Sequence, residues 1–168
     1  MPRRVRNPHG GLTPFDHHPE LWAAFNTYYG TLWSRGVVDD PTKEVGRLRN
    51  ARITGCGICK NLRFASARAQ GLDEASVDRI TDDFAASALP SRWKLAIRLA
   101  DALIADARVD GELRADLLAE FSDEEIVELT ATIATAIAFS KASVAFGAPD
   151  EMPLVVVPTP TVDGDVVR

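Results

Sequence analysis

Apolar residues recur every three to four positions through most of this chain, a spacing typical of α-helices that bury one face. Leu21, Phe25, Tyr28 and Leu32 follow this spacing in the segment that begins at Pro19. No stretch before roughly the last twenty residues alternates apolar and polar side chains for long enough to predict a sheet. The sequence therefore predicts an all-α fold, a compact bundle of about six to eight helices joined by short turns.

Capping residues and glycines divide this pattern into separate helices. Gly55 and Gly71 are typical helix ends, and Ser122 with Glu125 has the spacing of a capping box at a helix start. From Cys56 to Gly71 the helical spacing is unbroken, so one continuous helix is predicted there. The predicted helices cover residues 19–36, 41–54, 56–71, 72–84, 90–104, 110–121 and 122–146.

The length of the chain, 168 residues, is in the range of a single domain with its own core. Composition divides it into three predicted parts. Residues 1–13, rich in Pro, Gly and Arg, are expected to form an N-terminal arm, and residues 14–148 the helical domain. Residues 149–168, rich in Pro and Val, are expected to form a C-terminal tail, which contains the only strand-like run, Leu154–Val157.

The charge balance and the apolar stretches exclude two classes of partner. With 19 Lys and Arg against 24 Asp and Glu, the net charge of -5 gives no overall attraction to nucleic acid or anionic lipid. No apolar run follows the basic start of the chain, so no export signal is predicted. The most apolar stretch, residues 129–146, is interrupted by Thr, Ser and Lys, which indicates a buried or interface helix rather than a membrane span. We therefore expect a cytoplasmic protein.

Two cysteines, Cys56 and Cys59, form a Cys-x-x-Cys pair directly after Gly55. The spacing places both thiols on one face of a helical turn, which suits reversible closure of a disulfide. Backbone N–H groups and the dipole at a helix start favour the thiolate, the form that attacks peroxides and disulfides. In a reducing compartment such a pair is more often redox-active or metal-binding than a structural cross-link.

Two other interpretations of the pair stay open. Free cysteines are frequently buried and inert, and a zinc site would need about four ligands. The three histidines, His9, His17 and His18, all lie far upstream, near the predicted arm. The sequence therefore predicts no metal and no cofactor.

The residues around the pair resemble a known family, the alkylhydroperoxidase D-like (AhpD-like) and carboxymuconolactone decarboxylase-like proteins. The resemblance is carried by residues 43–59, where Glu44 stands twelve residues before Cys56, and it continues to the glycine that closes the next predicted helix. Residues 121–130 resemble a later helix start of the family. The resemblance covers most of residues 19–147.

This resemblance implies an all-helical homo-oligomer that reduces peroxides through its cysteine pair. In the family the second cysteine, here Cys59, attacks the peroxide, and the first, Cys56, closes the disulfide. Position alone would favour Cys56 as the attacking thiol, because it is nearer the helix start and usually more exposed. Glu44 would be the distal end of a proton relay. Its other interpretation is a first-turn glutamate that complements the helix dipole.

Two positions depart from the family's peroxidases, in which a histidine stands four residues after the second cysteine and often another stands between the two. Here those positions are Arg63 and Ile58. Arg63, expected one helical turn beyond Cys59 on the same face, would hold the thiolate by charge but could not act as a base. Its other interpretation is a surface arginine that is solvated or paired with a glutamate. With this pattern peroxidase activity would be slow, or the natural substrate would be a disulfide.

The remaining conspicuous side chains have simpler interpretations. Arg47, Arg49 and Arg52 form a basic cluster that is expected on a solvated helix face, paired with the abundant acids. The tryptophans and tyrosines are expected in the core or in an interface, because large aromatic side chains dominate buried area.

The function predicted from these observations is a thiol-dependent peroxidase or disulfide oxidoreductase in antioxidant defence. Its partners would be a hydroperoxide or disulfide substrate and a dithiol electron donor, such as a lipoyl or thioredoxin-like protein. One alternative is decarboxylation of a cyclic lactone in aromatic catabolism, which needs no cysteine pair. A second alternative, from a different class, is a non-enzymatic helical oligomer that senses redox state, and the missing histidines leave it open.

Overall fold

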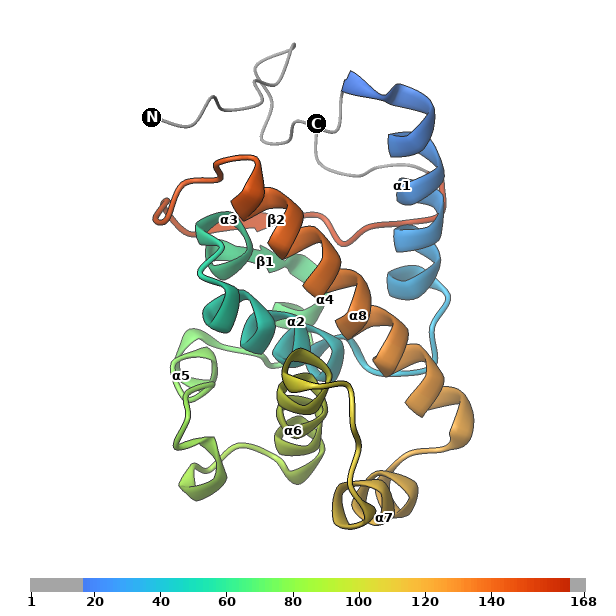
Figure 1. The fold of residues 1–168 in the computed structure, drawn as a ribbon, viewed down its shortest axis with the longest axis vertical. Coiled ribbons are helices and arrows are strands. Elements are labelled where there is room, and N and C mark those ends of the chain that lie inside the picture. The colour runs from blue at the N-terminus through green and yellow to red at the C-terminus, as the bar shows by residue number, and fades with distance from the viewer. Residues whose placement is uncertain (1–16, 164–168) are drawn as a thin grey trace.

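A single buried helix, α2 (Asp40–Thr54), lies at the centre of the fold (Figure 1). The computed structural model describes residues 17–163, and within that range every residue of α2 from position 40 to position 51 is buried. Two long helices, α6 (Ser91–Ala105) and α8 (Asp123–Ala145), pack against α2. The functional side chains that α2 carries are therefore enclosed by protein on several sides.

Local sequence signals explain where α2 begins and ends and how closely α8 approaches it. The Asp39 side chain caps the first turn by accepting the Thr42 backbone N–H at 2.9 Å. Gly55 ends the helix in the left-handed conformation, with φ of 70°. A Cβ atom at Gly46 would lie 2.8 Å from Cγ1 of Ile133, so the absence of a side chain there lets α8 pack directly on α2.

The all-α prediction is confirmed, since residues 17–163 contain eight α-helices and one short 3-10 helix. The capping box of Ser122 and Glu125 starts α8, as the sequence predicts, and the Asp110 side chain caps α7. The remaining helical elements are α1 (Pro19–Ser34), α3 (Gly57–Asn61), α4 (Ala65–Ala69), α5 (Glu74–Val77), η2 (Phe84–Ala86) and α7 (Gly111–Glu120).

The prediction of one continuous helix from residue 56 to residue 71 is wrong. Between α3 and α4 the chain forms a short strand, β1 (Leu62–Phe64), which pairs in parallel with β2 (Val155–Val157). The backbone groups of β1 are bound by α2 rather than by a helical turn. Arg47 donates to the Leu62 carbonyl at 2.6 Å, and the Phe64 N–H donates to Glu44 at 3.3 Å. These long-range contacts override the local helical spacing.

The segment expected as a C-terminal tail packs against the helical domain. Besides β2, its Pro149 carbonyl accepts the backbone N–H of Gly57 at 3.1 Å, and the Thr159 hydroxyl accepts the N–H of Ser66 at 3.0 Å. A Cβ atom at Gly30 would lie 2.1 Å from the Thr161 carbonyl oxygen, so the same segment also contacts α1. The division into arm, domain and tail stays a prediction, and the expected arm, residues 1–13, lies outside the described residues.

Three apolar clusters hold these elements together. One joins α6, α7 and α8, and a second joins α2 to α5, η2 and α6. The third consists of Leu32, Trp33, Phe64 and Val157, and it fastens α1 to the two-stranded sheet. By length and composition alone α8 could span a membrane, although part of its surface lies in the first cluster.

Candidate active site

The two cysteines meet at the start of α3, and their sulfur atoms lie 2.9 Å apart. Both are free thiols, and the Cys56 sulfur caps the helix by accepting the Cys59 backbone N–H at 3.4 Å. Cys56 is buried, whereas Cys59 is half-buried. Position along the helix favoured the first cysteine as the exposed thiol, so the order of exposure is the reverse of that expectation.

The contact between the two thiols shifts their pKa values in opposite directions. The hydrogen bond donated by Cys56 lowers the pKa of Cys59 to about 6, and Ser140 and the charge of Arg47 act in the same direction against the effect of burial. The same hydrogen bond, together with burial and the charge of Cys59, raises the pKa of Cys56. The pair therefore holds one thiolate, on Cys59, and one protonated thiol, on Cys56, near neutral pH.

The glycine between the cysteines is required by close packing. A Cβ atom at Gly57 would lie 2.3 Å from the carbonyl oxygen of Pro149 and 2.5 Å from the carbonyl carbon of Asp150. The segment that follows α8 thus lies directly on the first turn of α3. Any larger residue at this position would push that segment away or displace the thiols.

Glu44 lies within the protein, in an ion pair with Arg47. The Glu44 side chain is completely buried, and its two oxygens accept from Nε and Nη2 of Arg47 at 2.7 Å each. Arg47 also donates through Nη1 to the Cys59 carbonyl at 2.8 Å. Arg47 therefore links the Glu44 carboxylate to the backbone of Cys59.

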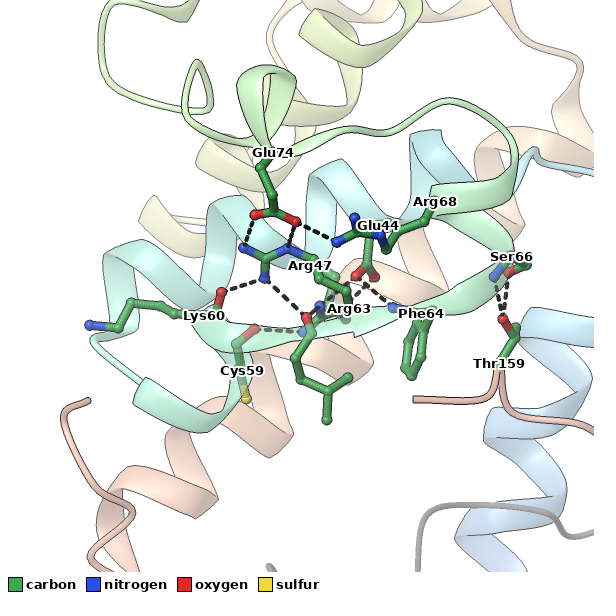
Figure 2. Close-up of polar contacts among 11 residues, drawn as sticks. Glu44, Arg47, Cys59, Lys60, Arg63, Phe64, Ser66, Arg68, Glu74 and Thr159 are labelled. Atoms are coloured by element: carbon green, nitrogen blue, oxygen red, sulfur yellow. Dashed lines mark hydrogen bonds and ion pairs between the residues drawn. The ribbon is translucent and has the colours of Figure 1, made fainter. Parts of the chain in front are cut away.

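Arg63 is not on the face of Cys59, which corrects the expectation from helical spacing. Because Arg63 lies in β1 rather than in a continuing helix, its side chain turns to the other side (Figure 2). Its guanidinium pairs with Glu74 at 3.0 Å and donates to the Lys60 carbonyl at 2.6 Å. In Figure 2 the Cys59 sulfur points the opposite way. Arg63 is thus paired with a glutamate, as its second interpretation expects, but it is buried rather than on the surface.

The expectation of a solvated basic face at Arg47, Arg49 and Arg52 is also wrong for the first two residues. Arg47 and Arg49 are only 5% and 8% exposed. Arg49 pairs with Asp101 on α6 at 2.6 Å, away from the cysteines. Arg52 is half-buried and donates to the Ile80 carbonyl. Arg47 is buried beneath α3 and β1, whereas Arg49 is buried against α6.

Two buried polar residues near Cys59 have no counterpart among the site residues predicted from the sequence. Ser140, on α8, forms a hydrogen bond with the Cys59 side chain. Its oxygen in turn accepts from the amide of Asn50 at 2.9 Å. Both residues are almost completely buried. The serine oxygen accepts from Asn50, and its single proton is available to donate to the Cys59 thiolate, whose pKa it lowers.

A cluster suited to a metal ion does not occur within residues 17–163, where no group of three His, Cys, Asp or Glu side chains converges. The thiol pair is instead surrounded by fixed hydrogen-bond donors and one fixed positive charge. Such surroundings favour nucleophilic attack by a thiolate and capture of the product by a second thiol.

Comparison with known proteins extends this description. No family model matches the chain. The uncharacterized proteins MT2376 and Rv2313c of Mycobacterium tuberculosis, from strains CDC 1551 / Oshkosh and H37Rv, are each 36% identical to it over 140 residues. That alignment covers 82% of this chain and 49% of theirs, so the chain spans about half the length of these curated relatives.

Two solved structures resemble the fold. A protein of unknown function from Agrobacterium tumefaciens, ATU0492, proposed to be the antioxidant defence protein AhpD, has a TM-score of 0.71 at 21% identity, over 88% of this chain and 97% of its own. An uncharacterized peroxidase-related protein from Silicibacter sp. TM1040 has a TM-score of 0.69 at 17% identity, over 82% and 74%. The resemblance predicted from the sequence is therefore confirmed for the fold: this chain has the all-helical fold of the AhpD-like proteins.

Proposed function

We propose that the protein is a thiol-dependent oxidoreductase of the AhpD-like family, active in antioxidant defence through Cys59 and Cys56. The observation that carries the proposal is the contact between the two sulfurs, 2.9 Å apart, with the more exposed one held as thiolate. The names of the two structural neighbours, one proposed to be an antioxidant defence protein and one called peroxidase-related, support the same class of reaction.

The proposed reaction begins at Cys59. Its thiolate attacks one oxygen of a hydroperoxide, the O–O bond breaks, and the departing alkoxide takes up a proton to become an alcohol. Cys59 is then a sulfenic acid. The Cys56 sulfur attacks the Cys59 sulfur, the S–O bond breaks, and the hydroxyl leaves as water with the proton of the Cys56 thiol. The two sulfurs lose two electrons in total, and the hydroperoxide gains them.

The same pair could exchange with a disulfide substrate. Attack by Cys59 would form a mixed disulfide and release one thiolate, and Cys56 would then displace the second thiol. In either case a dithiol donor, such as a lipoyl or thioredoxin-like protein, would reduce the Cys56–Cys59 disulfide by exchange. We expect this cycle in the cytoplasm, where disulfides are kept reduced.

Assembly as a homo-oligomer is part of the proposal. Only 28% of the most apolar stretch of α8 is buried within the described chain, and Val127 and Val144 on this helix are 69% and 43% exposed. On the neighbouring α1, Leu21 is 57% exposed. Exposed apolar side chains on two neighbouring helices favour burial against a partner, and we propose that a second copy of the chain covers them.

The proposal is tested by adding one molar equivalent of cumene hydroperoxide to the reduced protein. Free thiols are then titrated, and the peptide with both cysteines is weighed by mass spectrometry. Wild type should lose two thiols and two hydrogens. Cys56→Ser should stop at a sulfenic acid on Cys59, and Cys59→Ser should react much more slowly. Unchanged thiol content in the wild type, or equal reactivity of Cys59→Ser, would contradict the proposal.

Two further measurements separate the alternatives: the decarboxylation of a lactone, and turnover in the presence of a dithiol donor. A lactone decarboxylase would lose no activity in Cys59→Ser, because that reaction needs no thiol. A redox-sensing oligomer would close the disulfide once but would not turn over when a dithiol donor is supplied.

A further inference from the structure

The guanidinium of Arg47 connects α2 to the segment that carries the thiols. Its Nη1 donates to the Cys59 carbonyl at 2.8 Å, and its Nη2 donates to the Leu62 carbonyl at 2.6 Å. These two carbonyls bracket the last turn of α3 and the first residue of β1. With two further bonds to Glu44, Arg47 uses four of the five N–H donors of a guanidinium.

The Glu44 carboxylate also has its oxygens occupied by hydrogen bonds. Besides the two bonds from Arg47, its Oε1 accepts the backbone N–H of Phe64 at 3.3 Å, and its side chain is 0% exposed. Proton transfer to this carboxylate would turn an acceptor of three hydrogen bonds into a donor and leave a buried guanidinium without its counter-charge. Separation of a buried ion pair is strongly unfavourable, so Glu44 is poorly suited to carry a proton in each cycle.

We propose that Arg47 is the positioning residue of the thiol pair, and that Glu44 is its fixed counter-ion rather than a proton carrier. This inference rests on the proposed function and adds the roles of two further residues to it. The carbonyl contacts of Arg47 hold α3 against α2, and its charge stabilises the Cys59 thiolate without titrating. This role is the one that helical spacing assigns to Arg63, whose guanidinium binds Glu74 instead.

The groups that face Cys59 come from four elements. Cys56 is the N-cap residue of α3, Arg47 lies on α2 with its counter-ion Glu44, Ser140 lies on α8, and Tyr29 lies on α1. Burial raises the pKa of Tyr29, so its phenol stays protonated in the range where the thiols titrate. Cys56 is therefore the one neighbour among these that exchanges a proton with Cys59.

The test measures the rate of iodoacetamide alkylation of Cys59 as a function of pH, which does not depend on turnover. Glu44→Gln removes the counter-ion but keeps hydrogen-bonding atoms of similar shape, so the alkylation midpoint should move to lower pH by up to about one unit. The double variant Glu44→Gln with Arg47→Met removes both buried charges together, which a fold tolerates better than the loss of one. Its midpoint should move to higher pH by about one unit.

Arg49→Lys is the matched control. Arg49 is also a buried, acid-paired arginine of α2, but it faces Asp101 on α6. Its substitution should reduce stability to urea and leave the alkylation midpoint unchanged. A shift in the control as large as that of the double variant would mean that the midpoint reports general loosening, and the assignment to Arg47 would fail.

The rate of hydroperoxide reduction shows whether Glu44 is a fixed counter-ion or a proton carrier. If Glu44 carries no proton, the ratio of the hydroperoxide rate to the alkylation rate in Glu44→Gln should stay within about twofold of wild type. A drop in that ratio of about tenfold or more, with the midpoint unmoved, would establish a proton relay and overturn the proposal. If wild type fails to react with hydroperoxide at all, the proposed function fails, while the alkylation midpoints still decide the role of Arg47.

Discussion

Replacement of Cys56 by alanine should return the Cys59 thiol toward ordinary acidity. The largest contribution to the low pKa of Cys59 is the hydrogen bond from Cys56, and alanine removes that donor. A hydrogen bond to a charged group contributes about 1.5–3 kcal/mol, and one pKa unit corresponds to about 1.4 kcal/mol. The pKa of Cys59, about 6 in the wild type, should therefore rise by roughly one to two units.

The sign of the effect on reactivity follows from the thiolate being the reactive form. At a pH near 6 about half of Cys59 is thiolate in the wild type, and in Cys56→Ala the fraction should fall to about one tenth or less. Reactivity therefore decreases on acidification in both proteins, but over a higher pH window in the variant. The assay is the pH dependence of iodoacetamide alkylation, supported by the ultraviolet absorbance of the thiolate.

Two matched variants decide whether the reasoning holds. Cys56→Ser keeps a hydrogen-bond donor at the same atom position, so its alkylation midpoint should stay close to that of wild type. Cys59→Ala should have no titration near pH 6, because the remaining thiol, Cys56, is the protonated member of the pair. A midpoint of Cys56→Ala equal to that of wild type, or a reactive thiol near pH 6 in Cys59→Ala, would refute the assignment.

Three other predictions concern the surroundings of the pair. Arg63→Ala should leave the alkylation midpoint of Cys59 unchanged but lower the free energy of unfolding by about 1–3 kcal/mol in urea, since it removes the bonds to Glu74 and to backbone carbonyls; a raised midpoint would mean that its charge does reach the thiol. Gly57→Ala should lower the free energy of unfolding by about 1–3 kcal/mol and make the chain near Pro149 more sensitive to protease, because its Cβ would lie 2.3 Å from the Pro149 carbonyl oxygen. A variant as stable and as protease-resistant as wild type would count against that contact. Light scattering at micromolar concentration should give the mass of an oligomer, and a clean monomer would leave the exposed apolar face of α8 unexplained.

The helices could be predicted from sequence because their signals are local. Ser122 and Glu125 start α8, and Gly55 ends α2, through contacts within a few residues. Residues 154–157 are strand-like in sequence and contain β2, but β1 is only three residues long and lies within a helical pattern, so neither β1 nor its pairing with β2 could be predicted. Their pairing depends on contacts that no local pattern contains.

The cysteines could be found from their spacing and Glu44 from the family resemblance, but the contact of Arg47 with Glu44 and with the Cys59 backbone could not. Charged residues on a helix are normally solvated, so Arg47 was interpreted as a surface residue. The available signal was its position three residues after Glu44, which allows an ion pair on one helix face. Arg63 was placed beside Cys59 by helical geometry, and a strand at that position turns its side chain away.

The packing of the last described segment on the thiol site has a consequence for synthesis. Domains fold as units while the chain emerges, and residues made early wait for partners made later. Thr159, which accepts the N–H of Ser66, is separated from it by 93 positions in the sequence, and β1 likewise waits for β2. During translation the two cysteines are thus available before the contacts that define their geometry exist. Until the segment after α8 has been made and packs on Gly57, we expect the thiols of the nascent chain to have the acidity and reactivity of cysteines in an unfolded chain.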